Sequence, residues 1–217
     1  MSLLVKICGL STPETVDSAL EAGADMIGFV FFPPSPRFVA PAAAAPLAGR
    51  ARGRAAVAVL TVDMDEAGVA AIVEAVRPDW LQLHGREPPE QVAALKARFG
   101  LPVMKAIGIR EPADLAAVDA YRGVADRLLL DAKPPRGATR PGGNAVAFDW
   151  AILEGFAPGL PWMLSGGLDP GNVGAAVART RAPGVDVSSG VETAPGIKDP
   201  ALIAAFVAAA RAAAGSP

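Results

Sequence analysis

Two side chains in the sequence could move protons during a reaction. Cys8 follows the apolar residues Val5 and Ile7, and Asp131 follows a run of three leucines. An ionised thiol is a competent base, and a carboxyl group at the end of an apolar strand could hold a proton for donation. Each residue also has a structural interpretation, because a lone cysteine is often a small buried residue and an aspartate often caps a helix or turn. The strands and helices that position both residues therefore decide between the chemical and the structural interpretation.

Apolar β-like runs alternate with alanine-rich helical segments along the whole chain. The runs predict eight strands, at residues 3–8, 26–31, 55–62, 80–84, 102–107, 127–131, 162–165 and 185–188. Helical patterns follow them, opening at Ser11-Thr12-Pro13-Glu14, covering 42–48, 65–76 and 88–99, beginning near 112, 148 and 170, and covering 200–213. Such alternation is typical of a parallel sheet with right-handed crossovers.

Eight strand–helix units favour closure of the sheet into a barrel. The main alternative, an open doubly wound sheet, usually has fewer units and a glycine-rich first turn, whereas here that turn is Gly9-Leu10-Ser11-Thr12. No break in composition marks a second domain. The sequence therefore predicts an α/β protein with a single (βα)8, or TIM, barrel domain over residues 1–217.

Function in such barrels collects at the carboxyl ends of the strands. The chemically capable residues at the predicted ends are Cys8, Arg37, Asp63, His84, Asp131, Gly166, Gly167, Ser188, Ser189 and Gly190. The glycine pair after the seventh strand allows close backbone approach, and the Ser-Ser-Gly segment after the eighth offers hydroxyl and amide donors. Although a Gly-Gly pair alone is an ordinary turn, the two segments together predict a phosphate site in its usual place in this fold.

Composition narrows the class of ligand. A net charge of −2 and an aromatic content of 6% argue against nucleic acid as a partner. The single cysteine excludes an internal disulfide, and no Cys/His spacing suits a metal ion. The first residues lack the layout of a signal peptide, and the apolar stretch 201–214 is too short to cross a bilayer. A soluble, cytoplasmic protein that binds a small phosphorylated molecule, without metal, is expected.

Seven short motifs occur in an order that resembles one enzyme family. They are Lys6-Ile7-Cys8-Gly9, Gly28-Phe29-Val30-Phe31 with Ser35-Pro36-Arg37, Leu81-Gln82-Leu83-His84-Gly85, Leu130-Asp131-Ala132, Phe148-Asp149-Trp150, Ser165-Gly166-Gly167-Leu168 and Val185-Asp186-Val187-Ser188-Ser189-Gly190-Val191-Glu192. Each motif alone is weak, but together they cover the chain from the first strand to the last helix. The series resembles the phosphoribosylanthranilate isomerases of tryptophan biosynthesis.

The resemblance implies an Amadori rearrangement that needs no cofactor. N-(5-phosphoribosyl)anthranilate would become 1-(2-carboxyphenylamino)-1-deoxyribulose 5-phosphate. A general acid protonates the furanose ring oxygen and opens the ring to a Schiff base. A general base then removes the C2′ proton, and the resulting enolamine becomes the ketone. The resemblance assigns the base to Cys8 and the acid to Asp131.

Three further expectations concern groups around this pair. Lys6 should point to the same barrel face as Cys8, pair with Asp186 on the adjoining strand, and help to lower the thiol pKa toward neutrality. By resemblance, Arg37 would hold the anthranilate carboxylate, for which a guanidinium fork is suited, although it could equally be a solvated loop residue. His84 would contact the anthranilate side of the site or serve as an ordinary core histidine.

The segment 132–147 departs from the commonest family pattern, because Pro141-Gly142-Gly143-Asn144 stands where many relatives carry a Gly-Thr-Gly-like sequence. Its length and glycine content predict a lid over the substrate. The oligomeric state is left open between monomer and homodimer, and Asp63 has no assigned role.

Three other functions are alternatives to this one. A histidine-pathway isomerase should show two half-barrels and an aspartate in place of Cys8. The lysine and glutamate set of indole-glycerol-phosphate synthase is not recognisable. A catalytically silent barrel that only binds a phosphorylated metabolite would need neither Cys8 nor Asp131.

Overall fold

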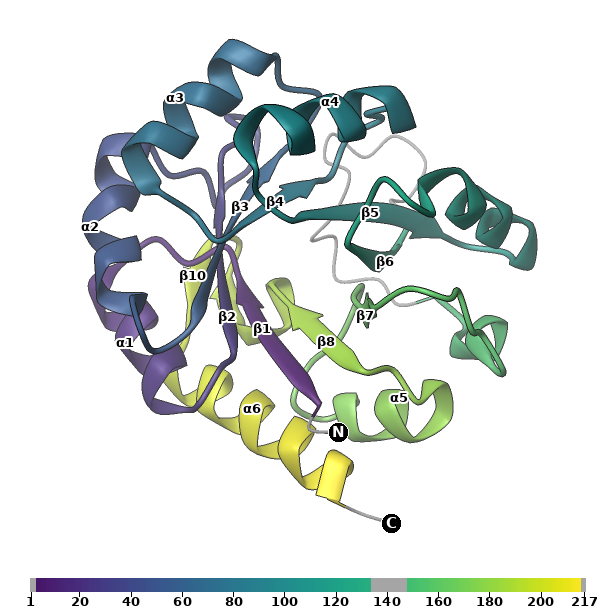
Figure 1. The fold of residues 1–217 in the computed structure, drawn as a ribbon. Coiled ribbons are helices and arrows are strands. Elements are labelled where there is room, and N and C mark those ends of the chain that lie inside the picture. The colour runs from purple at the N-terminus through teal and green to yellow at the C-terminus, as the bar shows by residue number, and fades with distance from the viewer. Residues whose placement is uncertain (1–2, 134–147, 216–217) are drawn as a thin grey trace.

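Eight parallel strands close into a barrel in the computed structural model, which describes residues 3–133 and 148–215 (Figure 1). Each strand pairs with the next along the chain, and β1 also pairs with β8, so the ring has no free edge. The strands are β1 (Leu4–Cys8), β2 (Met26–Val30), β3 (Ala56–Thr61), β4 (Trp80–Leu83), β5 (Val103–Ile109), β6 (Arg127–Ala132), β7 (Trp162–Leu164) and β8 (Gly184–Val187). The predicted TIM barrel is confirmed.

Helices surround the ring on its outer side (Figure 1). The α-helices are α1 (Pro13–Glu21), α2 (Pro41–Ala51), α3 (Glu66–Val76), α4 (Pro89–Phe99), α5 (Val173–Thr180) and α6 (Pro200–Gly215). Side-chain caps fix two of their starts: Thr12 accepts the amide of Thr15, and Asp65 accepts the amide of Gly68. The predicted capping hydroxyl of the first helix is therefore Thr12.

Two of the predicted helices are 3₁₀ segments. The fifth is η1 (Pro112–Tyr121), and the sixth is η2 (Trp150–Leu153). Among the residues of η1 only Val118 is fully buried, and η2 buries only Leu153. Helices in proteins gain most of their stability from packing of an apolar face, and these segments present almost none. The alanine-rich composition of the first was misleading for that reason.

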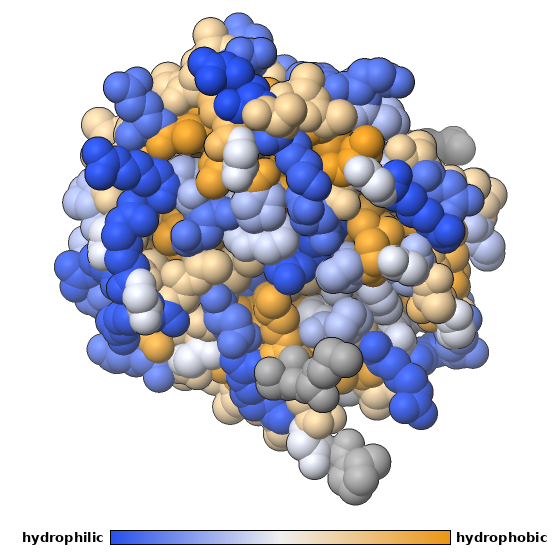
Figure 2. All heavy atoms as spheres, viewed as in Figure 1, coloured by the Kyte–Doolittle hydropathy of each residue, from blue (hydrophilic) through white to orange (hydrophobic). Residues whose placement is uncertain are grey.

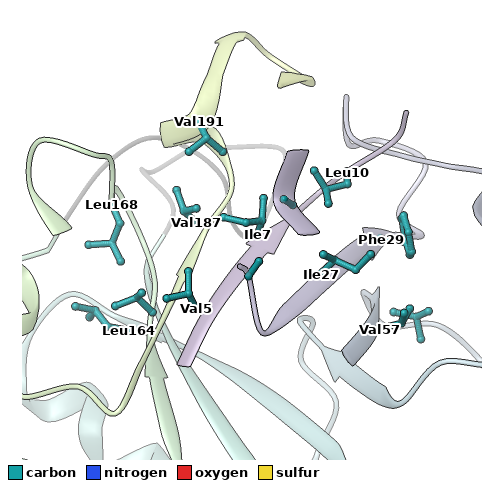
Figure 3. Close-up of a cluster of buried hydrophobic side chains, with 14 of the residues drawn as sticks. Val5, Ile7, Leu10, Ile27, Phe29, Val57, Leu164, Leu168, Val187 and Val191 are labelled. Carbon is teal, nitrogen blue, oxygen red and sulfur yellow. The ribbon is translucent and has the colours of Figure 1, made fainter. Parts of the chain in front are cut away.

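The alternation of side chains along each strand divides the hydrophobic core into residues outside the ring and residues inside it. The outer part lies between the sheet and the helices, and Figure 3 shows Val5 and Ile7 of β1 in it beside Val187 of β8. The inner part fills the barrel with Met26, Ala58, Met104, Ala106, Leu129 and Met163. The described interior of the barrel is thus a packed core, and function in this fold collects at the mouth where the strands end.

Aspartates brace the amino-terminal end of the barrel in a repeated arrangement. Asp25, Asp79 and Asp126 each precede an even-numbered strand. Their carboxylates accept the backbone N–H groups of Val5, Val57 and Val103 in the preceding odd-numbered strands, at 2.7–2.8 Å. These bonds satisfy donors at the start of the sheet and link neighbouring strands, on the face opposite the expected site.

Replacing Asp79 by alanine should therefore cost stability and leave catalysis intact. The Val57 amide would lose its partner, and such a loss costs about 1–3 kcal/mol of unfolding free energy. The melting temperature should fall by roughly 2–4 °C for each kcal/mol in a chain of this size. Thermal unfolding and kcat of the same preparation test this, and an unchanged melting temperature would contradict the bracing role.

Hydrophilic side chains are spread over the whole face of the molecule seen in Figure 2, between patches of apolar surface. No helix among the described residues is long and apolar enough to cross a membrane.

Candidate active site

A cavity opens at the carboxyl ends of the strands and gathers residues from almost every part of the barrel. Cys8 and Asp131 both line it, as do Arg37, His84 and Ser188 from the predicted set. The remaining lining residues are Val30, Phe32, Ser35, Leu60, Val62, Gln82, Ser165 and Asp186. The aliphatic members come mainly from β2 and β3, so the cavity has an apolar side suited to an aromatic ring and a polar side suited to a sugar.

Cys8 lies inside the barrel above a buried ion pair. Lys6, two residues earlier on β1, points to the same interior, and its Nζ donates to Asp186 Oδ1 of β8 at 2.7 Å. The register pairs these two residues directly, as expected from the sequence. Gly28 on β2 makes room for the thiol, since a Cβ there would lie only 2.8 Å from Cys8 Sγ.

The electrostatics of Cys8 differ from the expectation of a low thiol pKa. Burial raises the pKa of the Cys8 thiol above its ordinary value, and Asp186 adds to this. Lys6 and Lys198 act in the opposite direction but do not outweigh the loss of hydration. Burial works against the charge of Lys6, but Asp186 outweighs it and raises the pKa of Lys6 to about 12, so Lys6 stays charged. The free enzyme therefore keeps Cys8 mainly as the protonated thiol near neutral pH.

Direct titration of the thiol should show a midpoint above the ordinary value of about 8.5. Because Cys8 is the only cysteine, the difference in thiolate absorbance between the wild type and Cys8→Ser isolates its ionisation. The pKa of Cys8 is higher in the folded protein than in the unfolded chain, so the folded protein holds this proton more tightly. The thiol's contribution to stability is therefore present below the unfolded-state pKa and is lost as pH rises from there through the folded-state pKa. A titration midpoint near neutral pH would show that burial does not set the pKa of Cys8.

Asp131 is joined to His84 across the barrel. Asp131 Oδ2 lies 3.1 Å from His84 Nε2, and Asp131 Oδ1 accepts the amide of Ala132 at 2.9 Å. On the other side of the imidazole, Gln82 Nε2 lies 3.1 Å from His84 Nδ1. All three side chains are buried or nearly so. His84 is thus neither an isolated core residue nor an exposed one; it is the partner of the candidate acid.

Arg37 is held by residues that the sequence analysis did not single out. Its guanidinium donates from Nε and Nη2 to the two carboxylate oxygens of Glu192, at 2.7 and 2.8 Å. Lys198 Nζ donates to Glu192 at 2.8 Å and to the carbonyl of Ser188 at 2.8 Å. Glu192 and Lys198 sit on a small hairpin after β8, formed by β9 (Glu192–Ala194) and β10 (Ile197–Lys198).

The charges of this cluster depend on one another. Although burial works against the anionic form, Arg37 and Lys198 hold the pKa of Glu192 below its usual value. Burial lowers the pKa of Lys198 to about 8, against the attraction of Glu192. Arg37 is only 4% exposed and lines the cavity, so the interpretation of a solvated loop arginine is wrong. Glu192 instead fixes the orientation of its guanidinium.

A smaller pocket adjoins the cavity between the loops after β6, β7 and β8. It is lined by Gly166, Gly167, Ser188 and Ser189 from the predicted phosphate set, and by Asp131, Ala132, Lys133, Ser165, Leu168, Asp186 and Val187. Gly166 has φ +88°, and a Cβ there would lie 2.4 Å from the amide nitrogen of Ala132. Gly190 lies in the 3₁₀ turn η3 (Ser189–Val191), packed against Leu168, and does not belong to this described lining.

Asp63 has a structural role that the sequence did not reveal. Its Oδ1 accepts the amide of Arg86, and its own amide donates to Glu87 Oε1 at 3.0 Å. Glu87 in turn is paired with the buried Lys105 at 2.8 Å. These contacts join the loops after β3 and β4 and so support the loop that follows His84. The predicted lid falls mostly on residues 134–147, which lie outside the described residues.

Comparison with known proteins identifies the family. Residues 5–209 match the model of N-(5'phosphoribosyl)anthranilate (PRA) isomerase. The isomerase of Nitrobacter hamburgensis is 61% identical over 98% of this chain and 95% of its own length.

Two solved structures share the fold. One is phosphoribosyl anthranilate isomerase in complex with reduced 1-(o-carboxyphenylamino)-1-deoxyribulose 5-phosphate, with 32% identity and a TM-score of 0.84 over 97% of this chain and 99% of that one. The other, from Thermotoga maritima, is described as monomers of a dimeric phosphoribosylanthranilate isomerase, with 32% identity and a TM-score of 0.83 over the same shares. The chain belongs to the N-(5'-phosphoribosyl)anthranilate isomerase family.

Proposed function

We propose that this isomerase rearranges N-(5'-phosphoribosyl)anthranilate to 1-(2-carboxyphenylamino)-1-deoxyribulose 5-phosphate with Cys8 as general base and Asp131 as general acid. The activity follows from membership of the family and is a step of tryptophan biosynthesis. The observation that carries the two roles is that a thiol of β1 and a carboxyl of β6 line one cavity at the carboxyl ends of a closed barrel.

The proton transfers follow from this placement. Asp131 gives its proton to the furanose ring oxygen, the C1′–O bond breaks, and the anthranilate nitrogen supplies the electron pair that forms the Schiff base. Cys8, as thiolate, then takes the C2′ proton, and the electrons of that bond neutralise the iminium to give the enolamine. Loss of the enol proton and return of a proton to C1′ complete the ketone. Acid and base act on different atoms, so two separate groups are needed.

Two sets of residues would orient the substrate. The backbone amides and hydroxyls of Gly166, Gly167, Ser188 and Ser189 would hold the phosphate, with Gly190 shaping the turn behind them. Arg37, which lines the main cavity, would meet the anthranilate carboxylate in the orientation that Glu192 gives its guanidinium. His84 would act through Asp131 rather than on the anthranilate ring.

The activity is tested by following the loss of phosphoribosylanthranilate fluorescence with purified enzyme, and by rescue of a tryptophan auxotroph that lacks this isomerase. Turnover with rescue is the expected result. Tight binding of the substrate without turnover would favour a silent metabolite-binding barrel and overturn the proposal.

We also propose a cytoplasmic location and a monomeric or homodimeric state. A base thiol must stay reduced, and the cytoplasm keeps thiols reduced. The Thermotoga maritima relative is described in both monomeric and dimeric terms. Sedimentation of the purified protein distinguishes the two states.

A further inference from the structure

Gln82 is a buried polar side chain of the cavity to which the proposed reaction gives no task. It lies on β4 with no exposed surface, two residues before His84 and on the same inward face. Its Nε2 lies 3.1 Å from His84 Nδ1, and His84 Nε2 lies 3.1 Å from Asp131 Oδ2. The three side chains thus form one chain of hydrogen bonds from β4 to β6, across the intervening β5.

The chemistry of the amide decides where the histidine proton sits. A side-chain amide nitrogen can only donate, so Nδ1 of His84 must accept and carries no proton. In a neutral imidazole the proton then lies on Nε2, which faces Asp131 and donates to Oδ2. The opposite tautomer would present a lone pair to Asp131 and would compete with the substrate for the proton of the acid.

We propose that Gln82 is a positioning residue that fixes His84 as the Nε2–H tautomer, so that His84 donates to Asp131 and leaves the acid's proton for the substrate. This rests on the proposed role of Asp131. The N–H of His84 also stabilises the carboxylate that remains after Asp131 has given its proton away. In this orientation Gln82 Oε1 is buried without a hydrogen-bond partner among the described residues, whereas the reversed amide would turn that oxygen toward Nδ1 and favour the other tautomer, so the tautomer reports the orientation of the amide directly.

The chain offers an unusually direct test, because His84 is its only histidine. Long-range ¹H–¹⁵N correlation spectra of tag-free, ¹⁵N-labelled enzyme contain a single imidazole whose two nitrogens report the tautomer. The wild type should show a protonated Nε2 and an unprotonated Nδ1. Gln82→Met, which keeps the length and removes the amide, should give a mixture of tautomers. Gln82→Glu, which places an acceptor at Nδ1, should move a proton to Nδ1.

Catalysis should follow the tautomer in these variants. We expect kcat to fall about 10- to 100-fold in both, less than the loss from removing a general acid outright, with KM nearly unchanged. Gln91→Met is the matched control, since Gln91 lies on α4 and donates to the carbonyl of Met64 outside the cavity. It should alter neither the spectrum nor kcat.

Several outcomes would overturn the inference. A proton on Nδ1 in the wild type does so even if every variant fails to fold. Loss of kcat in Gln82→Met with the tautomer unchanged would reduce Gln82 to a structural role, and an unchanged kcat with mixed tautomers would make the tautomer irrelevant. Failure of the proposed function gives a different result. Full activity of Asp131→Asn would show that Asp131 is not the general acid, whereas the tautomer measured in the wild type would still stand.

Discussion

Cys8→Ser enzyme should bind its substrate and fail to turn it over. A serine hydroxyl fills nearly the same space but is far too weak a base to remove the C2′ proton, and a positioned base contributes about 10²- to 10⁴-fold to the rate. The kcat should fall by this factor. Substrate binding should persist, because the residues of the phosphate pocket and Arg37 keep their places without the sulfur atom.

Stopped-flow fluorescence separates these two effects by measuring substrate binding and substrate loss in one experiment. Cys8→Ala gives a second variant without a base and should match Cys8→Ser in kcat. Full turnover by either variant would show that the thiol is an ordinary core residue, packed with Val30 and Leu60 in the barrel mouth.

The same size of loss is expected when the acid is removed. In Asp131→Asn the amide oxygen can still accept from Ala132, but the side chain has no acidic proton for the ring oxygen. Ring opening should then limit the reaction, and kcat should fall by about 10²- to 10⁴-fold. The rate of substrate loss under saturating conditions measures this directly.

Asp63→Asn is the matched control for that experiment. Asp63 also stands at the end of a barrel strand, but it accepts the amide of Arg86 and is absent from the described lining of the cavity. An asparagine oxygen can replace that acceptor, so kcat should be retained. If Asp63→Asn and Asp131→Asn lost activity equally, the effect would reflect distortion of the rim, and the acid would have to be sought elsewhere.

The raised pKa of Cys8 means that the enzyme must act through a minor, ionised form of the thiol. A buried thiol beside the Lys6–Asp186 pair keeps its proton in the free enzyme, so the thiolate that acts on the substrate is a minor form. Lys6 and Lys198 make that form accessible by opposing the effect of burial. Lys198 loses its charge above about pH 8, so its support for the thiolate is strongest at lower pH.

The sequence by itself determined the barrel, the eight strands to within about two residues of their ends, and the pairing of Lys6 with Asp186. Alternation of side chains along a strand fixes which residues share a face, so the spacing of Lys6 and Cys8 alone places them on one side of the sheet. In a closed ring the first and last strands are neighbours, so Lys6 of β1 is expected beside Asp186 of β8, as the structure shows. Such inferences succeed because they need only local periodicity and closure of the ring.

Contacts between strands that are not neighbours were decided only by the tertiary structure. His84 and Asp131 are 47 residues apart, and their hydrogen bond depends on the radius of the closed ring. Arg37 meets Glu192 through a hairpin that the sequence analysis did not predict, across 155 residues. The prediction of a lowered pKa for Cys8 was wrong for a related reason. The charge of Lys6, two residues away, is visible in the sequence, but the burial that outweighs it is a property of the whole packed barrel.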